Sequence, residues 1–480
     1  MKGTFYWHDY ETWGTDPRRD RPAQFAGIRT DEDLNVVGKP LMIYCKPAND
    51  ILPQPDACMV TGILPQKALA EGVCEADFMA SIYAQLVRPG TCGVGYNSIR
   101  FDDEFTRYGL YRNFFDPYAR EWQNGNSRWD IIDMVRLTYA LRPEGIEWPK
   151  YEDGTPCFKL EKLTVANSIV HAAAHDALSD VHATIALAKL IKDRQPRLFD
   201  YIFNLRNKRL LDQQFDLRAK TPVLHVSSMF PAEFGRIAMV APVARHPTNK
   251  NGVIVFDLRH DPRPFLELSV ESLHERLFTP AAELPEGVER VPLKMVHLNK
   301  SPVVVPMNTL TPEAAERWQI DVAAGERHVQ ALCDAVGFDE KVRQAHGMHK
   351  FESASDPDHD LYGGFFGDSD RRLIDVVRKT RPQNMGGLEL AFDDRRLPEM
   401  LFRYRARNWP NTLSAEENIR WDEFRRARIT ESDGGGSITL ADYRERIAAL
   451  KSDSALSEEQ LSLLDDLSNW GESIDPTGTQ

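Results

Sequence analysis

The stretch Tyr6-Trp-His-Asp-Tyr-Glu-Thr-Trp-Gly-Thr15 decides how the rest of the chain is interpreted. Residues 4–12 are rich in aromatic and β-branched side chains and end just before Gly14, a pattern typical of a β-strand. Alternate strand side chains share a face, so Asp9 and Glu11 are expected about 7 Å apart on one face. Two neighbouring carboxylates are costly to bury unless a cation separates them. The stretch therefore predicts either a site for a hard divalent ion, Mg²⁺ or Mn²⁺, or an edge strand with one solvated face.

The composition indicates a multidomain protein of the cytoplasm. A chain of 480 residues is too long for one core and is expected to form two to four domains. It contains no apolar run long enough to cross a membrane and no N-terminal pattern of a signal peptide, so no membrane association is expected. The six cysteines include no Cys-x-x-Cys pair, which favours reduced core thiols over disulfides or a zinc site.

The charge is distributed unevenly along the chain. The formal net charge is −13, which for a uniform surface would argue against a nucleic-acid partner. Residues 201–250, however, contain eight Lys and Arg against three Asp and Glu. Because steering of a ligand follows the local field, a basic surface on an acidic protein is compatible with phosphate binding.

The first part of the chain has the element order of an α/β domain. Strands are expected at 4–12, 24–30, 36–45 and 91–96, and helices at 75–86, from 97 to about 114, at 130–141, from 160, and at 176–192. Three strands, a helix, a strand and further helices predict a mixed sheet flanked by helices. The segment around Pro196 marks the end of this domain, which we place at residues 1–195.

The remaining chain changes pattern twice. Short strands separated by turn residues predict a small β-barrel or sandwich, with strands at 223–226, 237–242, 253–258, 291–298 and 303–305. Helical patterns return at Pro312, and a polar linker covers residues 353–360. Amphipathic helices are expected at 414–430 and 440–450. These changes predict a β-barrel domain with flanking helices at 196–352 and a helical domain at 353–480.

Two further motifs contain residues suited to metal-dependent chemistry. In His175-Asp-Ala-Leu-Ser-Asp180, Asp176 is a good helix N-cap, which leaves His175 on the preceding loop and Asp180 in the first turn. Both side chains can then face one point; the alternative is an ordinary capped helix with a solvated histidine. Asp102 opens another helix, where it can act as a metal ligand or as an N-cap, a role that Asp103 fills equally well.

Asp9, Glu11, Asp102, His175 and Asp180 follow the order and context of the DEDDh exonucleases. The chain as a whole resembles the bacterial exodeoxyribonuclease I family. Five more segments carry that resemblance: Asp20-Arg-Pro-Ala-Gln-Phe25, Phe101-Asp-Asp-Glu104, Ala140-Leu-Arg-Pro-Glu-Gly145, Leu361-Tyr-Gly-Gly-Phe-Phe366 and Tyr404-Arg-Ala-Arg-Asn408. The resemblance implies a ribonuclease-H-like exonuclease domain, an SH3-like barrel and an all-α C-terminal domain. It also implies 3′→5′ hydrolysis of single-stranded DNA to 5′-mononucleotides.

The chemistry expected of such a site assigns a role to each residue. Phosphodiester hydrolysis needs an activated water and a stabilised leaving oxygen, which two Mg²⁺ ions about 4 Å apart supply. Asp9 is expected to bridge the two ions, with Glu11 and Asp180 completing the first and Asp102 supporting the second through water. His175, with an unperturbed pKa of about 6.5, is expected to be the general base.

Binding of a single strand needs cations for phosphates and aromatic faces for bases. The resemblance favours Arg107, Tyr118, Trp122, Arg136, Arg142 and Lys159 for these contacts. Trp13 and Phe101, beside the acidic motifs, are expected to stack on the terminal base. The family has arginine where this chain has Lys159, so a bidentate phosphate contact is not expected there.

The alternatives are a 3′→5′ exoribonuclease of the same superfamily and a non-catalytic single-strand-binding protein. The chain has about 280 residues beyond a nuclease domain, which favours the DNA enzyme over the exoribonuclease. The five intact site residues argue against a non-catalytic protein. The resemblance further implies a processive monomer that works in DNA repair and binds the acidic C-terminal tail of single-stranded-DNA-binding protein. Because the site residues all precede residue 181, residues 1–200 are expected to cleave DNA by themselves if they fold alone.

Overall fold

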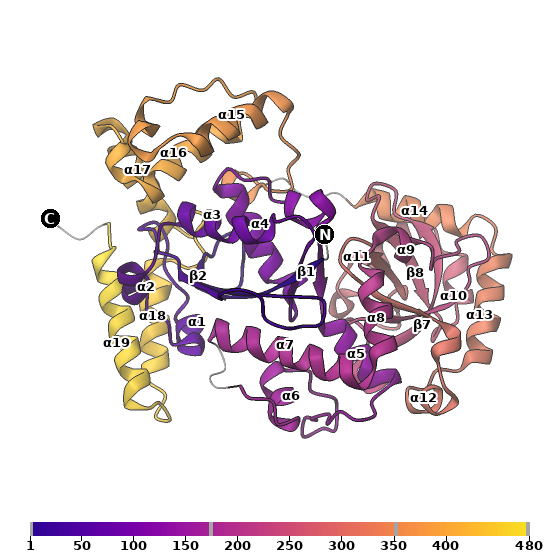
Figure 1. Ribbon diagram of the computed structural model, residues 1–480. Coiled ribbons are helices and arrows are strands. Elements are labelled where there is room, and N and C mark those ends of the chain that lie inside the picture. The colour runs from indigo at the N-terminus through magenta and orange to yellow at the C-terminus, as the bar shows by residue number, and fades with distance from the viewer. Residues whose placement is uncertain (1–2, 172–175, 350–353, 477–480) are drawn as a thin grey trace. The chain divides into compact units, whose positions relative to one another are not determined.

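The computed structural model describes residues 3–171, 176–349 and 354–476 (Figure 1). The chain divides into two compact units. Unit 1 contains residues 1–127, 171–182 and 353–480, and unit 2 contains residues 128–170 and 183–352. The first strands and the C-terminal helices, far apart in sequence, therefore belong to the same unit.

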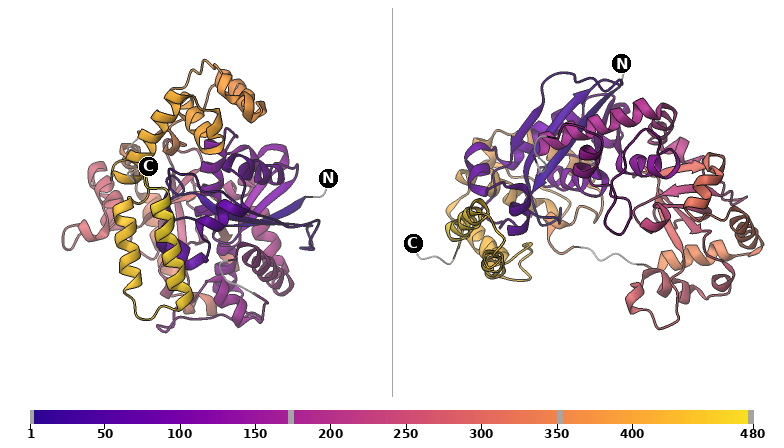
Figure 2. Two further views of the ribbon diagram at one scale, coloured as in Figure 1. Left: turned by 90° about the vertical axis from the view of Figure 1, so that its left-hand side faces the viewer. Right: turned by 90° about the horizontal axis from the view of Figure 1, so that it is seen from below.

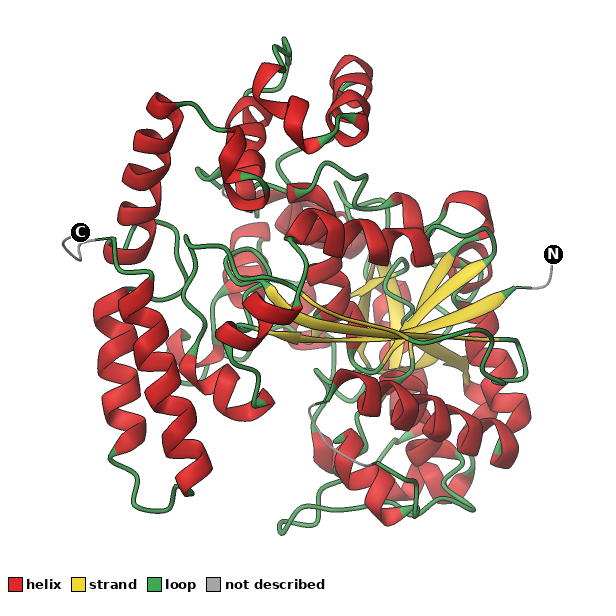
Figure 3. Ribbon diagram, turned by 60° about the vertical axis from the view of Figure 1, so that its left-hand side comes forward, coloured by secondary structure: helices red, strands yellow, loops and turns green. Residues whose placement is uncertain are grey.

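The sheet of unit 1 has β1 (Thr4–Thr12) at its centre. Strand β1 pairs antiparallel with β2 (Pro22–Thr30) and parallel with β4 (Thr91–Gly95), and β3 (Leu41–Tyr44) pairs antiparallel with β2. The sheet is therefore mixed, as predicted, and its strands are drawn in yellow in Figure 3. Strand β1 is an interior strand of this sheet and not an edge strand, because β4 pairs along Thr4–Trp7 and β2 pairs beside Asp9 and Glu11.

One face of β1 packs against helices. Tyr6 and Tyr10 belong to a buried apolar cluster with Phe25 of β2, and α3 (Glu75–Leu86) and α4 (Asp102–Arg112) contribute to it. Strand side chains alternate between faces, so Asp9 and Glu11 point to the opposite face. The apolar cluster therefore fixes the register that directs both carboxylates away from the core.

The predicted strands and helices of this part are largely confirmed. Strand β1 and helix α3 have the predicted limits, and β3 is shorter than residues 36–45. Residues 35–40 are exposed, and among them only Val36 forms a bridge, to Thr30. Two helices that we did not predict, α1 (Pro55–Thr61) and α2 (Pro65–Glu71), each begin with a proline, which is well suited to the first helical position.

The C-terminal helices complete unit 1 by sharing apolar cores with its N-terminal part. Helices α18 (Leu440–Lys451) and α19 (Glu458–Ser473) lie side by side (Figures 1 and 2). Their residues Tyr443, Leu467 and Trp470 share a cluster with Trp13 and Leu52. A second apolar cluster contains side chains from α4, from α15 (Asp368–Lys379) and from α16 (Arg396–Asn408).

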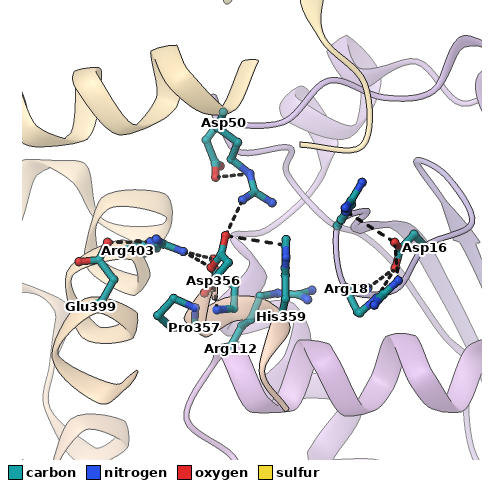
Figure 4. Close-up of polar contacts among 12 residues, drawn as sticks. Asp16, Arg18, Asp50, Arg112, Asp356, Pro357, His359, Glu399 and Arg403 are labelled. Atoms are coloured by element: carbon teal, nitrogen blue, oxygen red, sulfur yellow. Dashed lines mark hydrogen bonds and ion pairs between the residues drawn. The ribbon is translucent and has the colours of Figure 1, made fainter. Parts of the chain in front are cut away.

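A buried ion-pair cluster, formed by Asp50, Asp356, Asp358, Arg403, Arg407 and Arg428, reinforces this arrangement. Figure 4 shows three of its members, Asp50, Asp356 and Arg403. Nη2 of Arg407 lies 2.8 Å from the carboxylates of both Asp50 and Asp358. Arg403 reaches Asp356 at 2.5 Å, and Arg428 of α17 (Ala415–Thr430) lies 3.5 Å from Asp50. The side chain of Asp50 is 0 % exposed, so the C-terminal segment supplies the cations of a carboxylate that is buried in the N-terminal part. We therefore expect that residues 1–200 do not fold alone.

Unit 2 contains a five-stranded antiparallel sheet in the order β10-β6-β7-β8-β9. The strands are β6 (Val223–Val226), β7 (Ile237–Arg245), β8 (Gly252–Asp257), β9 (Leu293–His297) and β10 (Val303–Pro306). All five were predicted, and β7 extends three residues further because a register shift after Pro242 lets pairing with β8 continue. Its longer helices are α5 (Ile132–Leu141), α8 (Pro196–Leu205), α11 (Val270–Phe278), α13 (Val322–Asp334) and α14 (Phe338–Met348).

Helix α5 packs against β6 and β10 within this unit. Trp318 Nε1 donates a hydrogen bond of 2.8 Å to the Ala140 carbonyl of α5, and its ring lies 5.4 Å from the ring of Tyr139. The predicted N-terminal domain thus contributes a helix to the core around the small sheet.

In the described parts of the chain, no helix is long and apolar enough to cross a membrane. All six cysteines are free thiols.

Candidate active site

Three carboxylates from β1 and α7 (Ala177–Arg194) meet at one point. One oxygen from each of Asp9, Glu11 and Asp180 lies within 4.8 Å of the others. Strand β1 supplies Asp9 and Glu11 by alternation, and the start of α7 supplies Asp180. The Asp176 carboxylate accepts a hydrogen bond of 2.9 Å from the Ser179 N–H, as predicted for a helix cap, and so fixes where this first turn begins.

The structure separates the roles of the acids that open α4. Oδ1 of Asp102 accepts a 3.0 Å hydrogen bond from the Tyr10 backbone N–H, which places it beside the metal-site strand. Asp103 instead forms a buried ion pair of 2.5 Å with Arg120. Asp103 therefore has a structural partner, and Asp102 is the acid directed toward β1.

The electrostatics of this group favour a bound cation. Burial raises the pKa of Asp9 well above its ordinary value, and the carboxylates of Asp102, Glu11 and Asp180 raise it further. Burial also raises the pKa of Glu11 to about 8, with added repulsion from Asp180, Asp102 and Asp176. Oxygen ligands held this close suit a hard divalent ion, which would offset both effects. The residues present therefore fit a divalent metal site.

The described residues contain a histidine at this site that we did not predict. Nε2 of His171 lies 2.5 Å from Oδ1 of Asp180. His175, the predicted general base, lies outside the described residues. A signal was present in the sequence, because His171 precedes His175 by four residues in an alanine-rich segment.

The predicted strand-binding residues of unit 1 differ in accessibility. Trp122 is 67 % exposed, and Tyr118 is half-buried. Arg107 is buried, with hydrogen bonds of 2.7 Å to Glu121 and 2.8 Å to Glu104.

The two aromatics predicted to stack on the terminal base also differ. Trp13 is 1 % exposed and packs in the apolar cluster with α18 and α19, so a base cannot reach its ring in this conformation. Phe101 is half-buried, with its ring centroid 5.0 Å from that of Phe105.

Tyr118 and Trp122 line a pocket of about 550 Å³. The opposite wall comes from the segment before α15, where Phe365 is 81 % exposed and its ring meets that of Tyr118 edge-on at 5.7 Å. Arg371 and Arg378 of α15 also line the pocket, together with Asp116 and Asp375, and the two arginines pair with Asp368 and Asp375. Aromatic faces beside cations are the combination that single strands require. Sequence reasoning did not assign Phe365 to binding, because its position across from Tyr118 depends on folding of the C-terminal segment.

The other predicted strand-binding residues belong to unit 2. Arg136 pairs with Asp133 at 2.5 Å, and its guanidinium lies 5.9 Å from the ring centroid of Phe158. Arg142 is half-buried and donates to the carbonyls of Leu141 at 2.5 Å and Thr309 at 3.1 Å. Lys159, exposed, precedes α6 (Leu160–Ala166).

Family models match nearly the whole chain. A model described as "Exonuclease" matches residues 6–188, one described as "Exonuclease I SH3-like domain" matches 206–348, and one described as "Exonuclease I C-terminal domain" matches 355–474. The chain belongs to the exonuclease I family. These matches confirm the predicted fold class, in which an α/β exonuclease domain is followed by an SH3-like domain and a helical C-terminal domain. The predicted domain limits stay predictions.

Individual members of the exonuclease I family are similar over the full length. Exodeoxyribonuclease I of Escherichia coli is 48 % identical over 475 residues, covering 99 % of this chain and 98 % of that protein. Exonuclease I from Methylocaldum szegediense has a structure with a TM-score of 0.95 at 52 % identity, covering 98 % of this chain and all of that one. The E. coli enzyme in complex with a dA16 oligonucleotide also has a TM-score of 0.95, with 48 % identity and the same coverage. Further structures, each 47 % identical, are a zinc-bound complex of E. coli exonuclease I with single-stranded DNA and an SSB/exonuclease I complex with an inhibitor.

Proposed function

We propose that this protein degrades single-stranded DNA from the 3′ end and releases 5′-mononucleotides in a Mg²⁺-dependent reaction. The observation that carries the proposal is the convergence of Asp9, Glu11 and Asp180, with Asp102 held beside them by the Tyr10 N–H. Few structural roles are served by four carboxylates gathered around β1, whereas a hard cation requires such a set.

In this proposal each residue has a chemical task. Asp9, Glu11 and Asp180 hold the divalent ions, and Asp102 supports a second position through water. The ions contribute activation of a water molecule and stabilisation of the leaving oxygen. His175 accepts the proton of that water, because a neutral imidazole is a suitable base near neutral pH.

The strand itself is bound by residues of both units. In unit 1, we propose that bases stack on Tyr118, Trp122 and Phe365, whose rings are accessible at one pocket. Phe101 contacts the terminal base, and Arg107 and Trp13 support the binding surface from buried positions. In unit 2, Arg136, Arg142 and Lys159 contact phosphates, Lys159 as a single point charge.

The cation, the cellular setting and the partner follow from the family. Mg²⁺, or Mn²⁺ in its place, suits a site made of carboxylate oxygens alone, although the E. coli protein has been seen with zinc. We propose that the protein works as a processive monomer in DNA repair in the cytoplasm, and that it binds the acidic C-terminal tail of single-stranded-DNA-binding protein. The structure of an SSB/exonuclease I complex, in which exonuclease I is 47 % identical to this chain, supports this partner.

Digestion of end-labelled strands tests the proposal. Single- and double-stranded DNA and RNA of one sequence are incubated with the full chain, with Mg²⁺ and with chelator. We expect single mononucleotides to be released from the 3′ end of single-stranded DNA with Mg²⁺ only. Equal or faster digestion of RNA would favour the exoribonuclease alternative. Binding of DNA without any Mg²⁺-dependent cleavage would favour the non-catalytic one.

A further inference from the structure

His171 contacts a proposed metal ligand directly. Its Nε2 lies 2.5 Å from Oδ1 of Asp180, and the side chain of His171 is only 6 % exposed. The contact joins the residue before the undescribed segment 172–175 to the first turn of α7. The sequence motif His175-x₄-Asp180 does not include this histidine.

The charge state of Asp180 decides which atom donates. As an ionised metal ligand its carboxylate can only accept hydrogen bonds, so in that state the proton of the shared bond lies on Nε2 of His171. A carboxylate has two oxygens and several acceptor directions. If one direction is occupied by His171, Asp180 keeps others for a cation, in a fixed orientation.

Orientation matters at this carboxylate because Asp180 reaches the site from a different element than Asp9 and Glu11. The two β1 residues are held by strand pairing with β2, whereas Asp180 stands one turn into a helix. A free aspartate side chain in the first helical turn has several staggered rotamers. A hydrogen bond from a buried ring selects one of them.

We propose that His171 is a positioning residue of the metal site, which holds Asp180 in the orientation that binds the divalent ion. The proposal rests on the proposed function, because it takes Asp180 to be a metal ligand. Partners that hydrogen-bond to metal ligands typically contribute a factor of about 10–100 to metal affinity or activity. His171 is thus given a role distinct from that of His175, which acts on the water.

Metal binding in the absence of DNA provides the test. Mn²⁺ affinity of the full chain is measured by electron paramagnetic resonance for the wild type and for His171→Ala, His171→Gln and His182→Ala. We expect His171→Ala to bind Mn²⁺ about 10–100-fold more weakly. His171→Gln, which keeps an N–H donor, is expected to recover part of the loss. His182 is exposed on the same helix, so His182→Ala is the matched control and is expected to bind as the wild type does.

A metal titration of activity separates the two histidines. With His171→Ala, cleavage should return toward the wild-type rate as Mn²⁺ approaches saturation, whereas His175→Ala should stay slow at every concentration. Unchanged or tighter Mn²⁺ binding by His171→Ala would overturn the proposal. Tighter binding would show that the His171 ring competes with the metal ion for Asp180. A rate deficit that saturating metal does not relieve would also overturn it. A separate measurement tests the proposed function itself. If Asp9→Asn binds Mn²⁺ as tightly as the wild type does, Asp9 is not a metal ligand and the proposed function fails.

Discussion

Unit 1 contains two groups of buried carboxylates whose pKa values move in opposite directions. At the metal site, burial and mutual repulsion raise the pKa of Asp9 and Glu11. In the buried ion-pair cluster, burial alone would raise the pKa of Asp50 and Asp358, but the nearby arginines, Arg407 foremost, together outweigh burial and lower both. Burial raises the pKa in both groups, and the difference is whether the chain supplies its own cations.

This contrast identifies where an external cation is required. The ion-pair cluster is satisfied by Arg403, Arg407 and Arg428, so it needs nothing from solution. Burial and other carboxylates raise the pKa of Asp9 and Glu11. Among the described residues, the causes that act on Glu11 are burial and the carboxylates of Asp180, Asp102 and Asp176. Structural carboxylates and metal-binding carboxylates in one unit are thus distinguished by their partners, which are arginines for the first group and other carboxylates for the second.

The largest expected effect is the loss of the fold in a fragment of residues 1–200. This fragment lacks both the arginines of the ion-pair cluster and the C-terminal helices. Residues 1–200 expose Trp13 and Asp50, which are 1 % and 0 % exposed in the full chain. We expect this fragment to show no cooperative thermal transition by circular dichroism, in contrast to the full chain. A cooperative transition together with Mg²⁺-dependent release of nucleotides would show that the ion-pair cluster is dispensable.

Next, Asp9→Asn should abolish activity without weakening the fold. Loss of a metal ligand is expected to slow hydrolysis by more than the roughly 100-fold that loss of an outer partner causes. In metal-free buffer the variant should unfold at the same or a higher temperature, because one buried charge is removed from a like-charged group. Digestion rates measure the loss of activity, and calorimetry measures the unfolding temperature. Asp193→Asn is the control, because Asp193 is exposed on α7. A clear drop in thermal stability would mean that Asp9 is a structural carboxylate.

Asp50→Asn should have the opposite effect. Removing one partner of a buried ion pair typically costs about 3–5 kcal/mol, because the remaining charges are left uncompensated. Urea unfolding of the full chain measures the change. Asp422→Asn is the control, since Asp422 is 62 % exposed and pairs with Arg425 on the surface, where a pair contributes about 0–1 kcal/mol. If both substitutions lowered the free energy of unfolding equally, burial of the ion-pair cluster would not decide how much it contributes to stability.

Acid should destabilise the ion-pair cluster in a defined range of pH. The folded pKa values of Asp50, Asp356 and Asp358 lie below their unfolded values because nearby arginines outweigh burial. Their contribution to stability is therefore present above the unfolded pKa of about 3.9 and is lost as the pH falls through the folded values. Thermal unfolding between pH 6 and pH 3 measures this loss, which should be smaller in Asp50→Asn. An identical pH dependence in that variant would contradict the assignment.

The smallest effect concerns arginines whose charge is not neutralised. Arg142 donates to two carbonyls, which are neutral, whereas Arg136 already pairs with Asp133. Arg142→Ala is therefore expected to reduce the slope of log K against log[salt] for single-stranded DNA by about 0.7, and Arg136→Ala by less. Fluorescence anisotropy over a range of salt concentrations measures the slopes, with Arg263→Ala, a surface arginine paired with Asp261, as the control. An unchanged slope in Arg142→Ala would place the phosphates elsewhere.

The sequence by itself determined the features that depend on local pattern. Alternation along residues 4–12 placed Asp9 and Glu11 on one face, and the limits of β1 and α3 followed from residue type and from the turn residues that flank them. The capping preference of Asp176 located the start of α7, and with it Asp180. These signals act over one strand or one helical turn, so no knowledge of distant residues is needed to interpret them.

Only the tertiary structure decided which of several equivalent residues meets which partner. It placed β1 at the centre of its sheet, directed Asp102 toward β1 while Asp103 paired with Arg120, and buried Trp13 under helices more than 400 residues away. It also brought His171 to Asp180. Neighbouring acids or aromatics of the same type have the same local preferences, and the contacts that distinguish them come from segments distant in sequence, whose position depends on how the whole unit packs.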